Sequence, residues 1–260
     1  MTVSQTALAG LALSAVISLL FPFLVYFLCR RRMSLPLRNI AIGAGIFVLF
    51  VVVLEAAMHY YFLKFNPVTS AWLGSHPWGF AAYGAGAAAL YEETGRYMAM
   101  RLFVKRAGDP GTAVSYGIGH GGAESIIVGA LGQISAIVMA VMLNMGTLDA
   151  VLGSKVPAAA LAKIHAQFAH LNFALALAGG FERVWALLIQ IALSLLVWRA
   201  VARKQIRWYF AAMAMHFTLD FPAALTQKGV ISIFTVEIYV TLIGLCLLVF
   251  FFVKLPRRSA

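Results

Sequence analysis

Charged residues are scarce in this chain, and their scarcity excludes an ordinary soluble domain. Only 11% of the 260 residues are Asp, Glu, Lys or Arg, while 62% are hydrophobic. A soluble domain carries about 25% charged residues. The apolar runs lack strand-like alternation and reach about 20 residues or more, which is the length that a helix needs to cross the hydrocarbon core. The sequence therefore predicts an all-α, polytopic membrane bundle.

Cysteine is nearly absent as well. The two cysteines, Cys29 and Cys246, lie on or inside apolar runs. A disulfide framework or a zinc finger therefore has no support in the sequence. The first residues, MTVSQTALAG, also lack the basic start of a cleavable signal peptide, so we expect an uncleaved first span.

Seven apolar segments are expected to cross the membrane as a single domain over residues 1–260. They are residues 7–29, 39–63, 78–103, 113–144, 173–198, 208–225 and 231–253. The fourth is longer than a crossing requires, so we expect it to tilt, protrude or break near Gly129 or Gly132. The pair Gly179-Gly180 interrupts the fifth. Residues 157–170 are weakly amphipathic and form either a helix on the outer interface or a loop over the bundle.

A net charge of +11 could indicate a protein that binds nucleic acid, but the positions of the basic residues indicate membrane topology instead. Clusters follow alternate spans: Arg30, Arg31, Arg32, Arg38; Arg101, Lys105, Arg106; Arg199, Arg203, Lys204, Arg207; Lys254, Arg257, Arg258. The other loops carry only Lys64, Lys155, Lys163 and Lys228. The positive-inside bias then places the N-terminus outside and the C-terminus in the cytoplasm. We expect a multi-pass protein of the inner cell membrane, with the lipid bilayer and no nucleic acid as partner.

Most of the few acidic residues lie where they are least expected. Seven of the nine fall inside apolar stretches, namely Glu55, Glu92, Glu93, Glu124, Glu182, Asp220 and Glu237, and His59, His120 and His216 accompany them. A carboxylate in hydrocarbon costs about 2.5 kcal/mol or more. Such groups mark functional sites in membrane proteins, so the sequence predicts a polar site buried among the helices.

The third span carries the motif EETGR. Glu92 lies four residues and Glu93 three residues before Arg96, so either carboxylate can pair with the guanidinium on a helix. Adjacent side chains point about 100° apart, which lets one acid face the bundle centre while the other holds Arg96. Two close acids in a low dielectric suit a general base. The alternative is a structural Glu–Arg pair between helices.

The fourth and sixth spans each carry a histidine followed by an acid four residues later, in GHGGAE and HFTLD. His120 and Glu124 share one helical face, and so do His216 and Asp220. A histidine and a carboxylate at this spacing can chelate a divalent ion, or the acid can orient a metal-bound histidine. The alternatives are a glycine-lined helix contact and a satisfied buried pair.

The depth of these groups predicts that they meet. At about 1.5 Å per residue, the acids and histidines of the three spans fall in one slab, about 12 to 18 Å from the cytoplasmic face. Glu55 and His59 share a face of the second span and form a second layer nearer the outside, where we favour a structural or gating role.

In combination, EETGR, GHGGAE and HFTLD resemble the YhfC-type family of intramembrane metallopeptidases, which is similar to the PrsW and CAAX-protease-like membrane proteases. Phe181-Glu182-Arg183 also resembles the FER stretch of that family. The resemblance covers the chain from about the second span onward. It implies an intramembrane peptidase that acts on a membrane-embedded or lipidated peptide or protein substrate.

The resemblance also implies roles for individual residues. Zn²⁺ or another divalent ion would be held by His120, His216 and Glu124, although a metal-free mechanism with a glutamate-activated water remains open. The catalytic groups would be Glu92 or Glu93 as the base, Arg96 to fix the acid pair, and Asp220 to orient His216 or stabilise the oxyanion.

Two other functional classes compete with the peptidase. A transporter of protons or divalent cations would use the same acids and histidines, but the sequence shows no paired halves with matched broken helices. A non-catalytic scaffold would not need the three motifs to be retained together.

Overall fold

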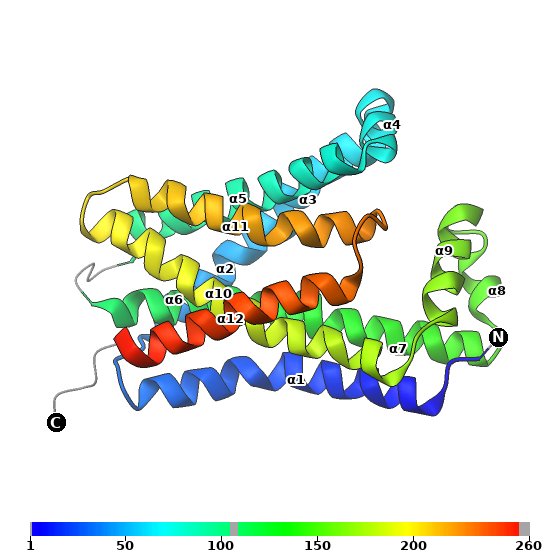
Figure 1. Cartoon of the computed structure of the whole chain (residues 1–260), viewed down its shortest axis with the longest axis horizontal. Coiled ribbons are helices and arrows are strands. Elements are labelled where there is room, and N and C mark those ends of the chain that lie inside the picture. The colour runs from blue at the N-terminus through cyan, green and yellow to red at the C-terminus, as the bar shows by residue number, and fades with distance from the viewer. Residues whose placement is uncertain (1, 105–108, 255–260) are drawn as a thin grey trace. The chain divides into compact units, whose positions relative to one another are not determined.

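The computed structural model describes residues 2–104 and 109–254, with side chains described to residue 249. Lys105, Arg106, Arg257 and Arg258 of the expected basic clusters lie outside the described residues. The described residues are helical and contain no strand, which confirms the predicted all-α, polytopic membrane class (Figure 1).

Each of the seven expected spans corresponds to one long helical segment. These are α1 (Gln5–Arg30); Leu37–Phe65, made of α2 (Leu37–Phe47), η1 (Val48–Glu55), α3 (Ala56–Tyr60) and η2 (Tyr61–Phe65); α5 (Pro77–Leu102); Pro110–Asn144, made of α6 (Pro110–Glu124), η3 (Ser125–Ala130) and α7 (Leu131–Asn144); α10 (Phe173–Ala202); α11 (Arg207–Gln227); and α12 (Ile233–Lys254). The shorter helices are α4 (Pro67–Ser75), α8 (Leu148–Leu152) and α9 (Ala158–Ala169).

Length and composition alone qualify four of the described helical segments as membrane spans. They are Gln5–Arg30, Leu37–Phe65, Pro110–Asn144 and Phe173–Ala202. Helix α5 carries Glu92, Glu93 and Arg96 in its interior, and α11 carries His216 and Asp220. The polar residues that predict a site thus also lower the apolarity of the helices that bear them. The count of seven crossings stays a prediction.

The expected breaks do not interrupt the helices. Pro110–Asn144 is continuous, and its middle segment η3, which contains Gly129, winds as a π-helix. Helix α10 also runs through Gly179 and Gly180 without interruption. At Gly180 the missing side chain serves packing, because an added Cβ would lie 2.8 Å from the Cα of Ser14, and its N–H donates to Ser14 Oγ at 3.1 Å.

The chain divides into two compact units, whose borders fall within α1, between α6 and η3, and within α10. Unit 1 comprises the residues up to Phe21 together with Ser125–Val184. Its apolar core gathers Val3, Ala7, Ala140, Leu143, Leu148 and Phe168. The segment expected as a helix or a loop at residues 157–170 is helical and forms α9. Its position at a membrane interface stays a prediction.

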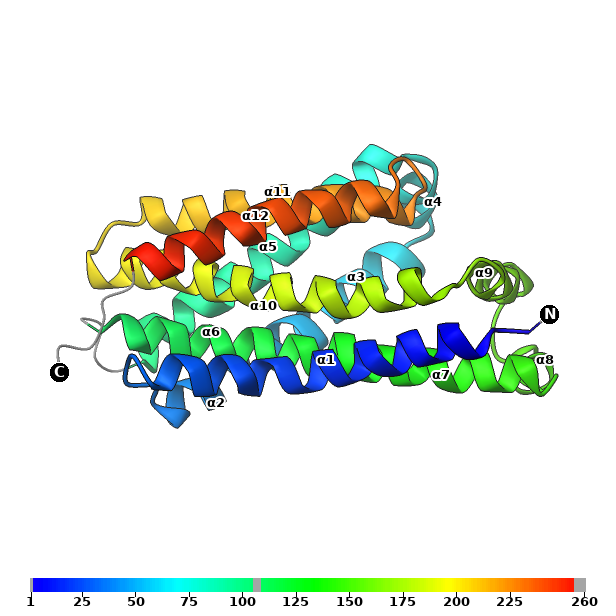
Figure 2. The same cartoon turned by 60° about the horizontal axis from the view of Figure 1, so that its bottom comes forward.

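Unit 2 runs from Pro22 to Glu124 and from Trp185 onward. Within it, α2 packs closely on α6, and α5 packs along α11, as both views show (Figures 1 and 2). The contact between α2 and α6 requires glycine. A Cβ at Gly43 would overlap the backbone oxygen of Tyr116, and a Cβ at Gly119 would overlap that of Ile40. These contacts place the backbone of α6 directly against α2, in line with the close approach that small residues allow in membranes.

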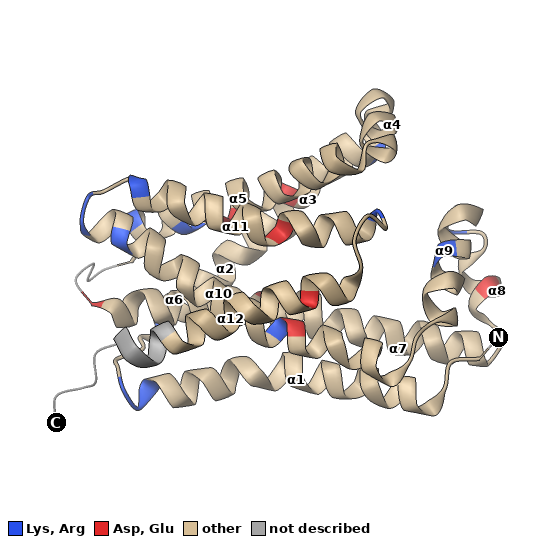
Figure 3. Ribbon diagram, in the orientation of Figure 1, with Lys and Arg blue, Asp and Glu red and all other residues tan. Residues whose placement is uncertain are grey.

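Many of the basic residues of unit 2 lie at the ends of its helices. Figure 3 shows Lys and Arg gathered at the end of α1 and at the connection between α10 and α11, while acidic residues lie within the lengths of α5 and α11. This arrangement agrees with basic loops on one side of the bundle and a polar site inside it.

Candidate active site

The site begins with three polar residues on one stretch of α5. Glu93 and Arg96 are fully buried and Glu92 is almost so. Arg96 Nε lies 3.2 Å from Glu93 Oε2, and Arg96 Nη2 lies 3.9 Å from Glu92 Oε2. Glu93 is therefore the closer partner of the guanidinium, which leaves Glu92 to face the neighbouring helix. The two adjacent acids thus differ in their nearest partners, while their chemical roles stay a prediction.

Helix α6 brings His120 to Glu92. The Nε2 atom of His120 lies 2.9 Å from Glu92 Oε2. The ring is fully buried and packs edge-on against Phe47 of α2, with ring centroids 5.2 Å apart. Its other nitrogen, Nδ1, is buried without a hydrogen-bond partner. Buried polar atoms normally have hydrogen-bond partners, so this nitrogen is an exception.

Helix α11 brings His216 to the same carboxylates. Its Nδ1 atom lies 2.8 Å from Glu93 Oε1, and its Nε2 atom lies 3.3 Å from Asp220 Oδ2 and 3.9 Å from Glu92 Oε1. The expected pairing of His216 with Asp220 along one helix face is thus confirmed. A neutral imidazole donates a hydrogen bond from only one nitrogen. Since both nitrogens face carboxyl groups, the second contact needs an additional proton, on the ring or on a carboxyl group, or a cation beside it.

Helix α10 contributes two residues that the sequence analysis did not assign to the site, Gln190 and Ser194. The side-chain amide of Gln190 donates to Glu92 Oε2 at 3.0 Å and to Glu124 Oε2 at 2.8 Å. Its side-chain oxygen accepts a hydrogen bond from Arg96 Nη2. The Nη1 atom of Arg96 donates to the backbone oxygen of Gln190 at 2.7 Å and to Ser194 Oγ at 2.6 Å. The buried guanidinium is therefore held by two helices.

Glu124 joins the cluster through the amide of Gln190, which connects it to Glu92. The seven residues that were predicted as catalytic or metal-binding therefore belong to one network, together with Gln190 and Ser194. The network lies wholly in unit 2. The predicted convergence of the third, fourth and sixth spans is present, and α10 adds a fourth helix to it.

The second layer of polar residues is also in contact. Glu55 Oε1 lies 3.1 Å from His59 Nε2, which confirms that the two share a helix face. His59 Nδ1 in turn lies 2.9 Å from the hydroxyl of Tyr83 on α5. In unit 1, Arg183 donates to the neighbouring Glu182. The role of these groups was left open by the sequence.

The donors in the cluster are of the type that binds divalent ions. Two imidazoles and several carboxylates suit zinc and its neighbours in the transition series. The acids around these imidazoles are close together, because Glu92 and Glu93 both lie within 4 Å of Arg96 and Gln190 links Glu92 to Glu124. In the part of the chain that the structure describes, however, the donors bond to one another, and no three His, Cys, Asp or Glu side chains are arranged around a common point.

Comparison with known proteins gives the chain its family. The model of the family described as "YhfC intramembrane metalloprotease" matches residues 17–240. The chain is also 37% identical over 256 residues to the protein named "Uncharacterized membrane protein YhfC" of Bacillus subtilis (strain 168), covering 98% of each chain. No solved structure matches. The match spans all four helices that build the cluster. This chain therefore belongs to the YhfC intramembrane metalloprotease family.

Proposed function

We propose that this chain is an intramembrane peptidase, which hydrolyses a peptide bond in a membrane-embedded or lipidated substrate. The observation that carries the proposal is the position of Glu92. Its carboxylate lies 2.9 Å from a ring nitrogen of His120 and 3.9 Å from one of His216. Burying a carboxylate in the membrane costs free energy, and such groups mark functional sites. A carboxylate between two imidazoles is also the arrangement expected of a group that exchanges protons during a reaction.

The metal would be bound by His120 and His216 with a carboxylate, for which we favour Glu124. The two imidazoles beside Glu92 support a cation at this place, and so does the unpartnered Nδ1 atom of His120. When bound, the ion supplies Lewis-acid polarisation of the scissile carbonyl and lowers the pKa of water. Zinc fits the donor set best, because imidazole and carboxylate are its common catalytic ligands.

Glu92 is the group to which we assign the proton transfer. In hydrolysis a water oxygen bonds to the carbonyl carbon, and the bond from that carbon to the amide nitrogen breaks. Glu92 takes the proton that water loses and passes it to the leaving amine, as a general base and then a general acid. Glu93 serves differently, because its carboxylate holds both Arg96 and the Nδ1 atom of His216.

Arg96 and Asp220 act through other residues. Arg96 hydrogen-bonds to both the backbone and the side chain of Gln190, and so fixes α5 against α10. Asp220 lies 3.3 Å from His216 Nε2 and orients that ring. We place the protein in the inner cell membrane with its N-terminus outside, since the basic residues follow alternate helices.

The proposal is tested with the purified full-length chain in lipid nanodiscs. A mixture of synthetic peptides that each contain an apolar segment is incubated with the wild type, with His120→Ala and with His165→Ala. The products are identified by mass spectrometry, and bound metal is measured in each protein. His165 is a matched control because it pairs with Asp149 at the surface of unit 1.

We expect the wild type and His165→Ala to cleave peptides and His120→Ala to lose both cleavage and metal. Full activity of His120→Ala without metal would remove the metal from the proposal. Movement of protons or divalent cations into liposomes by a wild type that cleaves no peptide would favour the transporter instead.

A further inference from the structure

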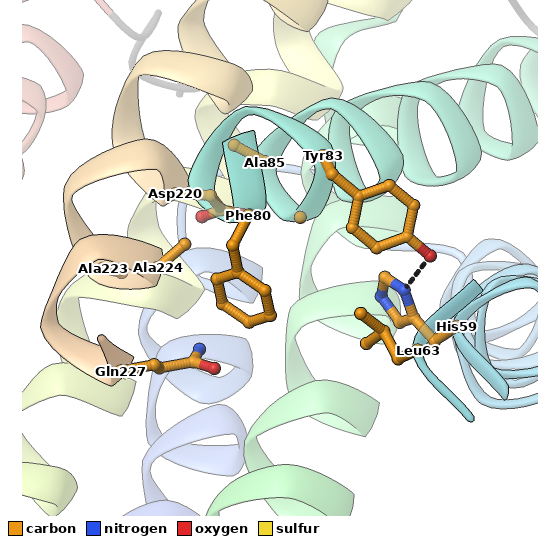
Figure 4. A pocket seen from close by; sticks show the side chains of 10 residues that line it. His59, Leu63, Phe80, Tyr83, Ala85, Asp220, Ala223, Ala224 and Gln227 are labelled. Carbon is orange, nitrogen blue, oxygen red and sulfur yellow. Dashed lines mark hydrogen bonds between the residues drawn. The ribbon is translucent and has the colours of Figure 1, made fainter. Parts of the chain in front are cut away.

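A cavity of about 370 Å³ lies beside the catalytic cluster, within unit 2. Figure 4 shows side chains from α3, η2, α5 and α11 around it, with His59 and Tyr83 joined by their hydrogen bond. The polar lining is His59, Tyr83, Asp220 and Gln227. The remainder is apolar and consists of Phe80, a leucine, three alanines and the backbone of Gly84.

The cavity meets the cluster at Asp220. The side chain of Asp220 is 41% exposed, while that of His216, which it contacts at 3.3 Å, is only 5% exposed. Asp220 is the member of the network that lines the cavity. A group occupying the cavity lies next to the residue that contacts a catalytic histidine.

The lining residues also give the cavity a direction. Phe80 lies in the first turn of α5 and Gln227 is the last residue of α11, so one end of the cavity is at the helix ends. Asp220 precedes Gln227 by seven residues, which corresponds to about 10 Å along a helix. The cavity therefore extends from the ends of α5 and α11 inward to the cluster.

The wall chemistry favours one class of occupant. The apolar residues provide most of the surface, and the hydroxyl of Tyr83 is already engaged by His59. Among the described residues that line the cavity there is no Lys or Arg to compensate a negative charge, and Asp220 contributes a carboxylate. A large apolar side chain is therefore accepted and an acidic one is repelled.

We propose that this cavity is the subsite that receives a large apolar side chain of the substrate next to the scissile bond. The inference rests on the peptidase function proposed above. Ligand pockets measure about 300–1,000 Å³, so a volume of about 370 Å³ fits one or two residues of an extended peptide. The occupant enters from the ends of α5 and α11 and places its backbone beside Asp220 and His216.

Gly84 sets the size of this subsite. A Cβ added there would meet only the Cβ of Ala224, at 3.9 Å, so a larger side chain has room to grow into the cavity. Gly86, two residues further along α5, offers a matched control. A Cβ there meets only the ring of Phe217, at 4.0 Å, and Gly86 does not line the cavity.

The experiment compares cleavage-site preferences of wild type, Gly84→Leu and Gly86→Leu in nanodiscs. The probe is a set of peptides that share one apolar segment and are randomised at the positions around it, with products read by mass spectrometry. We expect Gly84→Leu to lower the preference for Leu, Phe or Met over Ala at one position by at least about tenfold. Gly86→Leu keeps the wild-type preference. Asp and Glu are disfavoured at that position in the wild type.

The outcomes separate this inference from the function on which it rests. Cleavage by the wild type with an unchanged preference in Gly84→Leu overturns the subsite and leaves the peptidase intact. No cleavage by the wild type overturns both. Should Gly84→Leu fail to insert or fold, Gly84→Ala against Gly86→Ala makes the same comparison with a single methyl group, and an identical profile in that pair also overturns the subsite.

Discussion

Glu93 and His216 are 123 residues apart in the chain, yet Glu93 Oε1 lies 2.8 Å from His216 Nδ1 in the buried interior. This contact joins α5 to α11 and fixes the orientation of the imidazole ring. A carboxylate that binds Nδ1 of an imidazole leaves Nε2 for other partners. Glu93 therefore governs how His216 presents Nε2 to Glu92 and Asp220.

Replacing Glu93 with Gln should therefore impair turnover more than binding. The amide still fits the space but no longer holds the ring and Arg96 by charge. We expect kcat to fall about 10- to 100-fold with little change in KM, measured by peptide cleavage in nanodiscs. Thr94→Val is the control, since Thr94 Oγ1 contacts the Tyr209 hydroxyl at 2.8 Å and joins the same two helices outside the cluster. Equal kinetics of Glu93→Gln and Thr94→Val would contradict the positioning role.

Arg96→Met should unfold the protein more easily. The substitution leaves Glu92 and Glu93 buried without their guanidinium, and Gln190 and Ser194 without their donor. Removing one partner of a buried ion pair costs about 3–5 kcal/mol. The free energy of unfolding in detergent measures the effect, with Arg101→Met on the exposed end of the same helix as the control. A loss for Arg96→Met no larger than for Arg101→Met would show that the guanidinium has no structural part.

Gly43→Ala and Gly45→Ala should have opposite effects although they lie on one helix. A methyl group at Gly43 overlaps the backbone of α6, whereas nothing lies within 4 Å of the Cβ position at Gly45. We expect Gly43→Ala to destabilise by about 1–3 kcal/mol. Gly45→Ala should be neutral or stabilising by about 0.5–1 kcal/mol, because alanine favours a helix. The midpoints of thermal unfolding of the two variants measure the difference, and equal midpoints would contradict the close contact between α2 and α6.

The helices, and the convergence of EETGR, GHGGAE and HFTLD, could be predicted from the sequence because the membrane restricts both backbone structure and the burial of charge. The membrane leaves the helix as the only choice for apolar runs of this length. The cost of a charge in hydrocarbon then makes each buried acid conspicuous. Spacing also predicted correctly the pairs that lie on one helix, such as Glu93 with Arg96, Glu55 with His59 and His216 with Asp220.

Contacts between helices could not be predicted in this way. The partner of His120 across the helix contact is Glu92 of α5, and it depends on how α5 and α6 are rotated against each other. Local spacing carries no information on that rotation.

Gln190 and Ser194 could not be predicted as site residues for a different reason. Both are uncharged, so neither stands out by its cost in the membrane as an acid does. Their signal was the spacing of two polar residues four apart in the apolar stretch of α10 between Arg183 and Arg199, which places them on one face. Polar side chains on such a face hydrogen-bond to neighbouring helices in membranes, and here they bind the buried Arg96.

The cleavage rate of Glu92→Gln tests the central claim most directly. The substitution keeps the size of the side chain and removes its ability to take up a proton. We expect a loss of about 10²- to 10⁴-fold in kcat, with the protein inserted and folded as the wild type is. Glu237→Gln on α12 serves as the control and should retain full activity. Cleavage by Glu92→Gln at the rate of Glu237→Gln would contradict the account.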